Sequence, residues 1–389
     1  MRGISDTISR LAALRASRPA QATGGHGRLS RLTGFGSNPG ALDGWTYAPP
    51  DLAAGAPLVV VLHGCTQTAA GYDHGAGWST LADRFGFALL FPEQTRANNP
   101  NLCFNWFLAE DTRRGGGEAL SIAQMIETAA QAHRVDRRRV FVTGLSAGGA
   151  MAAAMLATYP ELFAGGAIIA GLPYGVAHSV PEAFDRMRGH GVPGAKELQR
   201  LLRQASDHPG PWPTLSLWHG GSDMTVAVAN ADAIVEQWRG AHGIEAASES
   251  RELVDGHLRR VWRDASGREA IEAYTIANMG HGTPLGTAGE EGYGASGPFM
   301  LEAGISSTRR IAEFWGIAVP AKARPGKAVA PPLATRPESR PEARRPSGLP
   351  ELPSPARHDG RRREAAPDAA ASKVGRVIED ALRKAGLMR

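Results

Sequence analysis

The stretch Arg139-Val-Phe-Val-Thr-Gly-Leu-Ser-Ala-Gly-Gly149 decides the fold that we expect for this chain. It begins with a short, mainly apolar run, which is typical of a buried strand. Residues 144–148 match the pattern G-x-S-x-G, and the alanine-rich residues 147–158 predict a helix. This pattern places the serine on a sharp turn between a strand and a helix, so that its Oγ projects above the edge of a sheet. We therefore predict that Ser146 is a nucleophile; the alternative is a glycine-rich turn with a structural serine.

Predicted strands and helices alternate on both sides of this motif. Further strands are expected at 45–47, 57–62, 87–91, 166–170, 214–218 and 271–276, and further helices at 72–85, 118–133, 226–242 and 307–315. Such alternation predicts an α/β fold with a mostly parallel sheet and helices on both faces. Residues 173–213 interrupt the alternation, and we expect a lid-like insertion or a helical excursion there.

Composition divides the chain into four parts. Residues 1–39 are an N-terminal segment whose first 20 residues predict a short amphipathic helix, and residues 40–318 are the α/β domain. Residues 319–371 are rich in Pro, Ala and Arg without apolar periodicity, so we predict a disordered linker. Residues 372–389 have one apolar helical face and predict a short amphipathic helix.

Charge and composition exclude several classes of partner. The formal net charge is +5, but residues 322–389 contain 16 Lys and Arg against 8 Asp and Glu, so the α/β domain is slightly acidic. We therefore expect no nucleic-acid partner. No run of 18 apolar residues occurs, which predicts no transmembrane helix. The His and Cys residues lack metal-ligand spacing and no phosphate-binding glycine loop occurs, so we expect neither a metal nor an organic cofactor.

A serine is a poor nucleophile at neutral pH until a neighbouring base takes its proton. Of the 12 histidines we favour His281, which lies in a loop after a late predicted strand. Glycines on both sides of His281 would let its ring turn inward. His219 is the rival, but it directly follows a predicted strand, and we expect it to orient its loop instead.

The acid that orients this histidine should lie between the serine and the histidine in the sequence. Asp223 meets this condition, and it stands just past a predicted strand and before a predicted helix. Asp207 and Asp232 are rivals that we interpret as surface carboxylates. Asp223 would fix the tautomer of the imidazole and stay ionised itself.

Backbone amides for an oxyanion hole are expected at two places. His63, Gly64 and Cys65 follow the predicted strand at 57–62. In hydrolases with this nucleophile motif, that loop donates one N–H and the residue after the nucleophile donates the other. We therefore expect the amides of Cys65 and Ala147 to be the donors. His63 is interpreted as a structural residue that holds its loop by hydrogen bonds.

Five short segments of the chain form a combination that is more specific than any one of them: Leu62-His-Gly-Cys-Thr-Gln67, Phe91-Pro-Glu-Gln94, Cys103-Phe-Asn-Trp-Phe107, Gly144-Leu-Ser-Ala-Gly-Gly149 and Gly280-His-Gly-Thr-Pro284. With these segments the sequence resembles the polyhydroxybutyrate depolymerase family of esterases in the α/β-hydrolase superfamily. The resemblance spans roughly residues 40–318. It implies that Ser146 is the nucleophile, with Asp223 and His281 as its partners, and that Cys65 belongs to the oxyanion hole.

The resemblance also implies features of the surrounding loops. It implies a disulfide between Cys65 and Cys103 and suggests Trp106 and Asn105 as substrate-binding residues. Trp106 would be a wall for an apolar ester chain; simple packing is the alternative. Phe104 stands where relatives commonly carry Trp, which would reshape a subsite. An extracellular location follows from the resemblance, whereas the N-terminus has no clear signal peptide, so a cytoplasmic location is the alternative.

The expected function is hydrolysis of carboxylic esters through an acyl-enzyme. The expected substrate is poly(3-hydroxybutyrate) or a related short-chain hydroxyalkanoate ester. Because the superfamily includes feruloyl and acetylxylan esterases, an esterase of that type, or one for small esters, is the alternative. A non-catalytic binding protein on a hydrolase scaffold is the alternative of another class. A missing triad residue would favour it, and none is missing.

Overall fold

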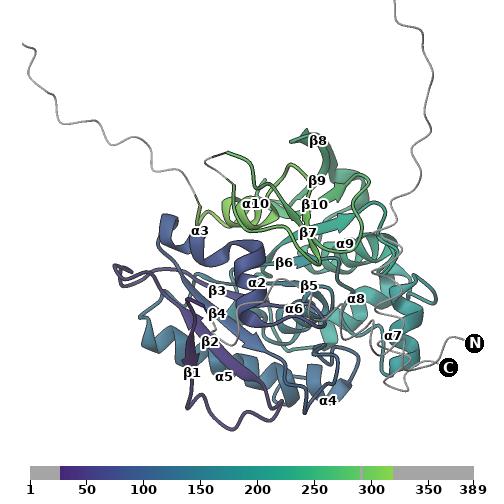
Figure 1. Ribbon diagram of the computed structural model, residues 1–389. Helices are drawn as coiled ribbons and strands as arrows, with labels where there is room; N and C mark the ends of the chain where they lie inside the picture. The colour runs from purple at the N-terminus through teal and green to yellow at the C-terminus, as the bar shows by residue number, and fades with distance from the viewer. Residues whose placement is uncertain (1–26, 290–291, 319–389) are drawn as a thin grey trace, which may run out of the picture. The chain divides into compact units, whose positions relative to one another are not determined.

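The computed structural model describes residues 27–289 and 292–318. The predicted N-terminal helix, linker and C-terminal helix lie outside the described residues. Within them, one ten-stranded sheet has the strand order β1-β2-β4-β3-β5-β6-β7-β10-β9-β8 (Figure 1). Its strands are β1 (Ser30–Leu32), β2 (Asp43–Tyr47), β3 (Leu58–Leu62), β4 (Ala88–Glu93), β5 (Val140–Leu145), β6 (Gly165–Ile169), β7 (Thr214–Gly220), β8 (Glu249–Val254), β9 (His257–Arg263) and β10 (Glu269–Ile276).

The centre of the sheet is parallel. Strands β4, β3, β5, β6, β7 and β10 pair in parallel in that order, and antiparallel strands flank them on both sides. A small second sheet pairs β11 (Thr283–Leu285) with β12 (Met300–Glu302). The helices are α2 (Ala69–Ala76), α3 (Trp78–Phe85), α4 (Ala109–Thr112), α5 (Gly117–Ala132), α6 (Ala147–Thr158), α7 (Val180–Met187), α8 (Ala195–Gln204), α9 (Ala229–His242) and α10 (Ser307–Phe314), with short 3₁₀ turns at Pro160–Leu162 and Ala246–Ser248.

The sheet is buried on both faces, which explains why its strands are continuous apolar runs. Along β3, Leu58, Val60 and Leu62 pack into a core with residues of α5, α6 and α9. The alternate residues Val59 and Val61 pack into a second core with residues of α2, α3 and α10. Both faces are therefore covered by helices, which confirms the predicted α/β architecture.

The predicted helix at 72–85 is in fact two helices, α2 and α3, that meet at Gly77. Gly77 has a φ of 77°, a conformation that favours glycine. A Cβ atom there would lie 2.4 Å from the backbone nitrogen of Gly294. The Asp73 side chain then accepts a hydrogen bond from the Ser79 N–H, at 2.7 Å, in the first turn of α3. A close backbone approach thus breaks a segment whose apolar pattern is continuous.

The antiparallel hairpin of β8 and β9 was not expected from the sequence. Its first strand is mostly exposed and charged, so it lacks the apolar run by which the other strands were found. Its turn, Asp255-Gly256, has positive φ at both residues, 50° and 82°. Asp-Gly with this conformation is a strong signal for a two-residue hairpin, and that signal was available in the sequence.

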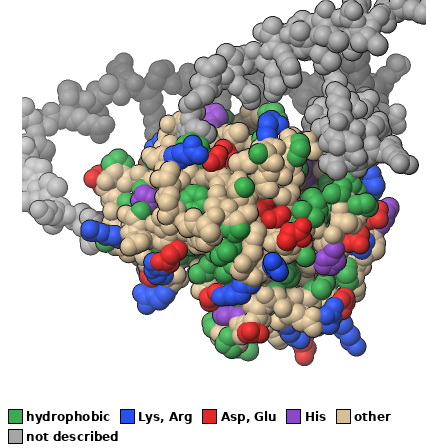
Figure 2. All heavy atoms as spheres, turned by 90° about the horizontal axis from the view of Figure 1, so that it is seen from below, with side chains coloured by type: hydrophobic (Ala, Val, Ile, Leu, Met, Phe, Trp, Pro, Cys, Tyr) green, Lys and Arg blue, Asp and Glu red, His purple; other side chains and the backbone are tan. Residues whose placement is uncertain are grey.

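Residues 173–213 contain α7 and α8, so the predicted helical excursion is correct. On the face seen in Figure 2, acidic and basic side chains are interspersed rather than gathered in one patch. Among the helices of residues 27–289 and 292–318, none combines the length and the hydrophobicity that a membrane-spanning segment requires. In the same part of the chain, His, Cys, Asp and Glu side chains form no cluster of three that could hold a metal ion.

The order of the strands places the predicted site residues together. From β3 the chain moves to β4 on one side, and then to β5 on the other side, so the strand order reverses between β3 and β5. In open parallel sheets, ligands bind at the carboxyl ends of the strands at such a switch point. Cys65 follows the end of β3 and Ser146 follows the end of β5, directly at this point.

Candidate active site

Ser146 stands on the sharp turn between β5 and α6. Its φ of 56° and ψ of −117° are unusual for a residue with a side chain, which indicates a strained backbone. A Cβ atom on Gly144 would lie 2.3 Å from the Gly148 carbonyl oxygen, and one on Gly148 would lie 2.4 Å from the His63 carbonyl oxygen. Both glycines of the motif are therefore required by close backbone contacts, as the sequence pattern predicts.

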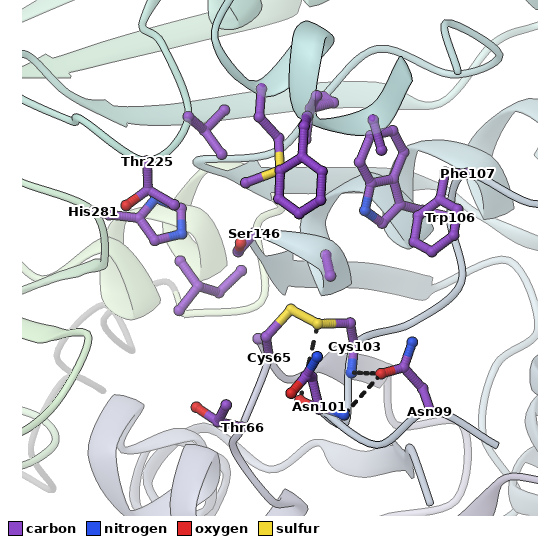
Figure 3. A pocket seen from close by; sticks show the side chains of 18 of the residues that line it. Cys65, Thr66, Asn99, Asn101, Cys103, Trp106, Phe107, Ser146, Thr225 and His281 are labelled. Atoms are coloured by element: carbon purple, nitrogen blue, oxygen red, sulfur yellow. Dashed lines mark hydrogen bonds between the residues drawn. A yellow bond between two sulfur atoms is a disulfide. The ribbon is translucent and has the colours of Figure 1, made fainter. Parts of the chain in front are cut away.

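His281 and Asp223 meet above the carboxyl ends of β7 and β10. The His281 Nδ1 lies 2.7 Å from the Asp223 Oδ2, although the two residues are 58 apart in the sequence. The other carboxylate oxygen, Oδ1, accepts the N–H groups of Thr225 and Val226 at 2.8 and 2.9 Å. Because Nδ1 faces the carboxylate, the Nε2 of the ring is left for the pocket, which His281 and Ser146 line together (Figure 3).

His219, the rival histidine, contacts Asp223 rather than the pocket. Its Nε2 lies 2.8 Å from the Val226 carbonyl oxygen and 3.5 Å from the Asp223 Oδ2. The ring is buried, and it is not among the described residues that line the pocket. The contact with Asp223 was not foreseen from the sequence. Of the rival acids, Asp232 is exposed and pairs with Arg260 at 2.7 Å, as expected of a surface carboxylate.

The environment of Asp223 keeps this carboxyl ionised. Burial by itself would raise the pKa of Asp223. The hydrogen bonds and charge interactions with His219 and His281 outweigh burial and hold the pKa below its ordinary range. A carboxylate that stays ionised can fix the tautomer of His281 and stabilise its protonated form.

The loop after β3 offers a backbone amide to the same pocket. Cys65 and Ala147 both line the pocket with Ser146. Ala147 is the first residue of α6, so its N–H has no partner within the helix. In the described part of the chain, neither amide donates a hydrogen bond to another protein group. Two N–H donors are thus free for a developing oxyanion.

His63 holds this loop from behind, as predicted. Its Nε2 accepts the N–H of Gln94 at 3.1 Å, so the ring proton is on Nδ1, which donates to the Gly64 carbonyl oxygen at 2.8 Å. Burial lowers the pKa of His63 to about 4, which keeps the ring neutral. Gln67 adds a second support, because its Oε1 accepts the Gly64 N–H at 2.8 Å.

Cys65 and Cys103 form a disulfide, the pairing that the resemblance implied. The bond connects the loop after β3 with the loop after β4. A backbone hydrogen bond from Thr66 to the Asn101 carbonyl oxygen, at 2.7 Å, connects the same two loops. The disulfide lies beside Asn99 and Asn101 at the polar side of the pocket (Figure 3).

The rest of the pocket wall is mostly apolar. Figure 3 shows Trp106 on the side opposite His281, with Ser146 between them. Helix α7 contributes residues that the sequence did not single out; their only signal was the apolar face of a predicted helical segment. The apolar lining consists of Trp106, Phe107, Leu145, Leu172, Val180, Ala183, Phe184, Met187, Val226 and Phe299, and the polar lining includes Thr66, Gln67, Asn99, Asn101 and Thr225.

Two expectations for this wall are corrected. Asn105 is buried and is not among the described lining residues; its N–H donates to the Glu118 Oε2 at 2.9 Å, and its side chain accepts from Asn99 at 2.9 Å. Phe104 packs in the core against the His63 ring, with 5.0 Å between the ring centroids, so it does not shape a subsite directly. Asn105 is thus a buried neighbour of the lining residue Asn99, and Phe104 is a core residue.

We expect removal of the disulfide to weaken both the fold and the site. In the double variant Cys65→Ser/Cys103→Ser, the loss of a bridge across 38 residues should reduce the free energy of unfolding by roughly 3–4 kcal/mol. Urea denaturation would measure this loss, and kcat should fall because the Cys65 amide becomes mobile. A stability equal to that of the wild type would contradict the prediction, as would two reactive thiols in the unreduced, denatured wild type.

The chain is similar to known esterases in sequence. The sequence profile of the family described as Esterase PHB depolymerase matches residues 43–259. The chain is 45% identical over 296 residues to poly(3-hydroxyalkanoate) depolymerase C of Paucimonas lemoignei, a match that covers 74% of this chain and 70% of that protein. It is 31% identical over 278 residues to acetylxylan esterase A of Emericella nidulans, which covers 68% of this chain and 88% of that protein.

The likeness extends to a solved structure. An acetyl xylan esterase from Aspergillus awamori matches the structure with a TM-score of 0.64 at 24% sequence identity. The match covers 75% of this chain and 100% of that chain. This confirms the predicted α/β-hydrolase fold.

Proposed function

We propose, from the premise that this chain belongs to the Esterase PHB depolymerase family, that it hydrolyses polyesters of short-chain 3-hydroxyalkanoic acids such as poly(3-hydroxybutyrate). The chain is a carboxylic ester hydrolase. The choice of substrate rests on one observation, the higher identity to the Paucimonas lemoignei depolymerase than to the acetylxylan esterase.

In the mechanism that we propose, the Ser146 Oγ attacks the carbonyl carbon of the ester while the Nε2 of His281 takes the proton. Asp223 remains a carboxylate and stabilises the imidazolium. The N–H groups of Cys65 and Ala147 hold the negative oxygen of the tetrahedral intermediate. His281 then returns the proton to the leaving alkoxide, which departs as an alcohol.

The acyl-enzyme that remains is an ester of Ser146. His281 deprotonates a water molecule, which attacks the acyl carbonyl carbon through a second tetrahedral intermediate. The bond to the Ser146 Oγ breaks, the serine recovers its proton from His281, and the carboxylic acid is released. Each step reuses the same base and the same pair of amides, so the site needs no second set of groups.

The pocket has both apolar and polar lining residues, which supports a substrate with apolar and polar groups in each unit. A 3-hydroxybutyrate unit carries an apolar methyl group and a polar ester group. The apolar wall of Trp106, Leu172 and Met187 would contact the methyl group and hydrocarbon of the acyl unit. Asn101 and Gln67 also line the pocket and would offer amide groups to the polar part.

Hydrolysis of four substrates side by side tests this proposal. We expect the purified chain to hydrolyse p-nitrophenyl butyrate and to clear a suspension of poly(3-hydroxybutyrate), with little release of ferulate from methyl ferulate or of acetate from acetylated xylan. Ser146→Ala is the control, and it should lose nearly all activity on all four. Hydrolysis of the ferulate or xylan substrate without clearing of the polyester would contradict the proposed substrate and leave the esterase assignment intact.

A further inference from the structure

Glu118 is a buried acid that the proposed mechanism does not use. It lies in the first turn of α5, and its side chain has no exposure to solvent (0%). Its Oε1 accepts hydrogen bonds from the side-chain amides of Gln94 and Asn98, at 2.6 and 3.1 Å, and its Oε2 accepts the backbone N–H of Asn105 at 2.9 Å. One carboxylate therefore binds the beginning, the middle and the end of the loop that follows β4.

One set of these contacts leads to the loop after β3, which carries the Cys65 amide. Gln94, whose side chain is bound by Glu118, donates its backbone N–H to His63, and His63 donates to the Gly64 carbonyl oxygen. That carbonyl and the N–H of Cys65 belong to the same peptide group. A trans peptide is planar and its C=O and N–H point in opposite directions. Fixing the Gly64 oxygen behind the loop therefore fixes the direction in which the Cys65 N–H faces the pocket.

A second set of contacts leads to the other end of the disulfide. The side chain of Gln94 also donates to the Cys103 carbonyl oxygen at 3.0 Å. Glu118 binds the N–H of Asn105, two residues further along. The chain is thus held at the Cys103 carbonyl group and again at Asn105, and the disulfide transmits this restraint to Cys65. The two sets of contacts meet again at the residue whose amide is a proposed oxyanion donor.

Stability alone does not explain a carboxylate at this position. Burial, and after it the nearby charge of Asp111, raises the pKa of Glu118 to about 8. A raised pKa means that the ionised carboxyl is less favourable in the folded chain than in the unfolded chain. Between the ordinary pKa of about 4.3 and the raised value, this acid therefore makes folding less favourable as the pH rises. We therefore look for the role of Glu118 in the hydrogen bonds that it makes, because its charge does not stabilise the fold.

We propose that Glu118 is a positioning residue of the oxyanion hole, which holds the Cys65 amide in place through Gln94 and His63 and through the disulfide. This rests on the proposed function, since it assumes that Ser146 forms a tetrahedral intermediate. Glu118 touches neither the substrate nor the reacting atoms. It acts by keeping the donor at its position before the charge develops, the condition under which an oxyanion hole is effective.

Glu118→Gln is the decisive variant because it keeps the size of the side chain. Glutamine has one acceptor oxygen and one NH₂ group, so it presents a donor to at least one of the three donors that surround Glu118. At pH 9, above the raised pKa of Glu118, the wild-type side chain is an ionised acceptor. There we expect kcat for p-nitrophenyl butyrate to fall roughly 10- to 100-fold, as for a small displacement of a catalytic group. KM should stay within about twofold of the wild type, because the affected contact is made in the transition state.

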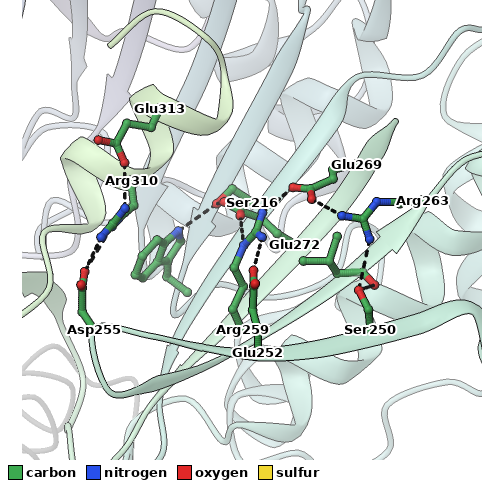
Figure 4. A network of polar contacts seen from close by, with 12 residues as sticks. Ser216, Ser250, Glu252, Asp255, Arg259, Arg263, Glu269, Glu272, Arg310 and Glu313 are labelled. Atoms are coloured by element: carbon green, nitrogen blue, oxygen red, sulfur yellow. Dashed lines mark hydrogen bonds and ion pairs between the residues drawn. The ribbon is translucent and has the colours of Figure 1, made fainter. Parts of the chain in front are cut away.

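Glu272 provides a matched control on the other side of the domain. It is equally buried (1% exposed), and burial raises its pKa to about 7. It accepts hydrogen bonds from Ser216 and Arg259 in a network on β7, β9 and β10 that does not reach the pocket lining (Figure 4). Glu272→Gln should lower the melting temperature and leave kcat within about twofold of the wild type.

A transition-state analogue separates positioning from general damage. A butyl trifluoromethyl ketone adds to an active-site serine and places an oxyanion in the hole. Its inhibition constant should rise in Glu118→Gln by the same factor by which kcat/KM falls, and should not change in Glu272→Gln. Gln94→Met, which removes the link from Glu118 to Cys103, should give a smaller change in the same direction and serves if Glu118→Gln does not fold.

Two outcomes would overturn the inference. One is a folded Glu118→Gln protein with unchanged kcat and unchanged affinity for the ketone. The other is a fall in kcat with no change in that affinity. The proposed function fails in a different way: the wild type would then form no ketone adduct, or Ser146→Ala would still form one.

Discussion

Ser146→Ala should lower kcat for p-nitrophenyl butyrate by a factor on the order of 10⁵ to 10⁶. The variant loses the only oxygen on this turn that can attack the ester, while the pocket and the free amides of Cys65 and Ala147 stay in place. Some rate above that of water should remain, because substrate binding and the oxyanion hole still operate. Single-turnover kinetics with the enzyme in excess over the substrate, followed over long times, would measure it.

His281→Ala and the double variant Ser146→Ala/His281→Ala test whether the two residues act together. Because the serine and its base act as one unit, the double variant should be about as inactive as either single variant. Losses that multiplied would mean that the two residues act independently. Ester hydrolysis at the wild-type rate in a purified, folded Ser146→Ala protein would contradict the assignment of the nucleophile.

Asp223→Asn should lower kcat by about 10⁴ while the fold is retained. The asparagine keeps the shape of the side chain and one oxygen for the N–H groups of Thr225 and Val226. Its NH₂ group can face the Nδ1 of His281, which favours the tautomer with the proton on Nε2, and such a ring cannot accept the proton of Ser146. Asp232→Asn, a change at the exposed acid on α9, is the matched control and should keep the wild-type kcat.

The low pKa of Asp223 adds a test by pH. Because the pKa of the folded state lies below the ordinary value of about 3.9, the ionised carboxyl stabilises the fold above that value. This contribution is lost as the pH falls through the lowered pKa. Thermal unfolding should thus show Asp223→Asn less stable than the wild type at pH 7, with the difference shrinking toward pH 3. A constant difference would mean that the charge of Asp223 does not stabilise the fold.

The hairpin of β8 and β9 shows which strands of this chain can be predicted from local apolar patterns and which cannot. Central strands were found because burial on both faces demands a continuous apolar run, and β3 is such a run. Strand β8 is an edge strand paired with β9, is mostly exposed and carries charged residues, so apolar patterning missed it. The turn at Asp255 and Gly256 carried the remaining signal.

The sequence by itself determined the turn at Ser146. A glycine two residues before and a glycine two residues after are needed because backbone atoms approach within 2.4 Å of where a Cβ would be. The contact at Gly144 is local to the chain, whereas the contact of Gly148 with His63 forms only in the fold, but both leave their mark in the G-x-S-x-G pattern. The order of serine, acid and histidine, together with the positions of Asp223 and His281 in loops after predicted strands, then favoured these two partners. Both assignments remain predictions until the variants are measured. The alternation of elements determined the class of fold.

Tertiary structure decided which polar side chains share a neighbourhood. Asn105 looked like a pocket residue beside Trp106, yet it is buried, with its N–H bound to Glu118 and its side chain to Asn99. His219 contacts Asp223 and is not among the described lining residues of the pocket. Glu118 is one acid in an ordinary helical pattern until the fold brings Gln94 and Asn105 to it. Hydrogen bonds act over about 3 Å between residues far apart in the chain. Their partners therefore depend on how strand ends and loops assemble, which no local pattern of residues specifies.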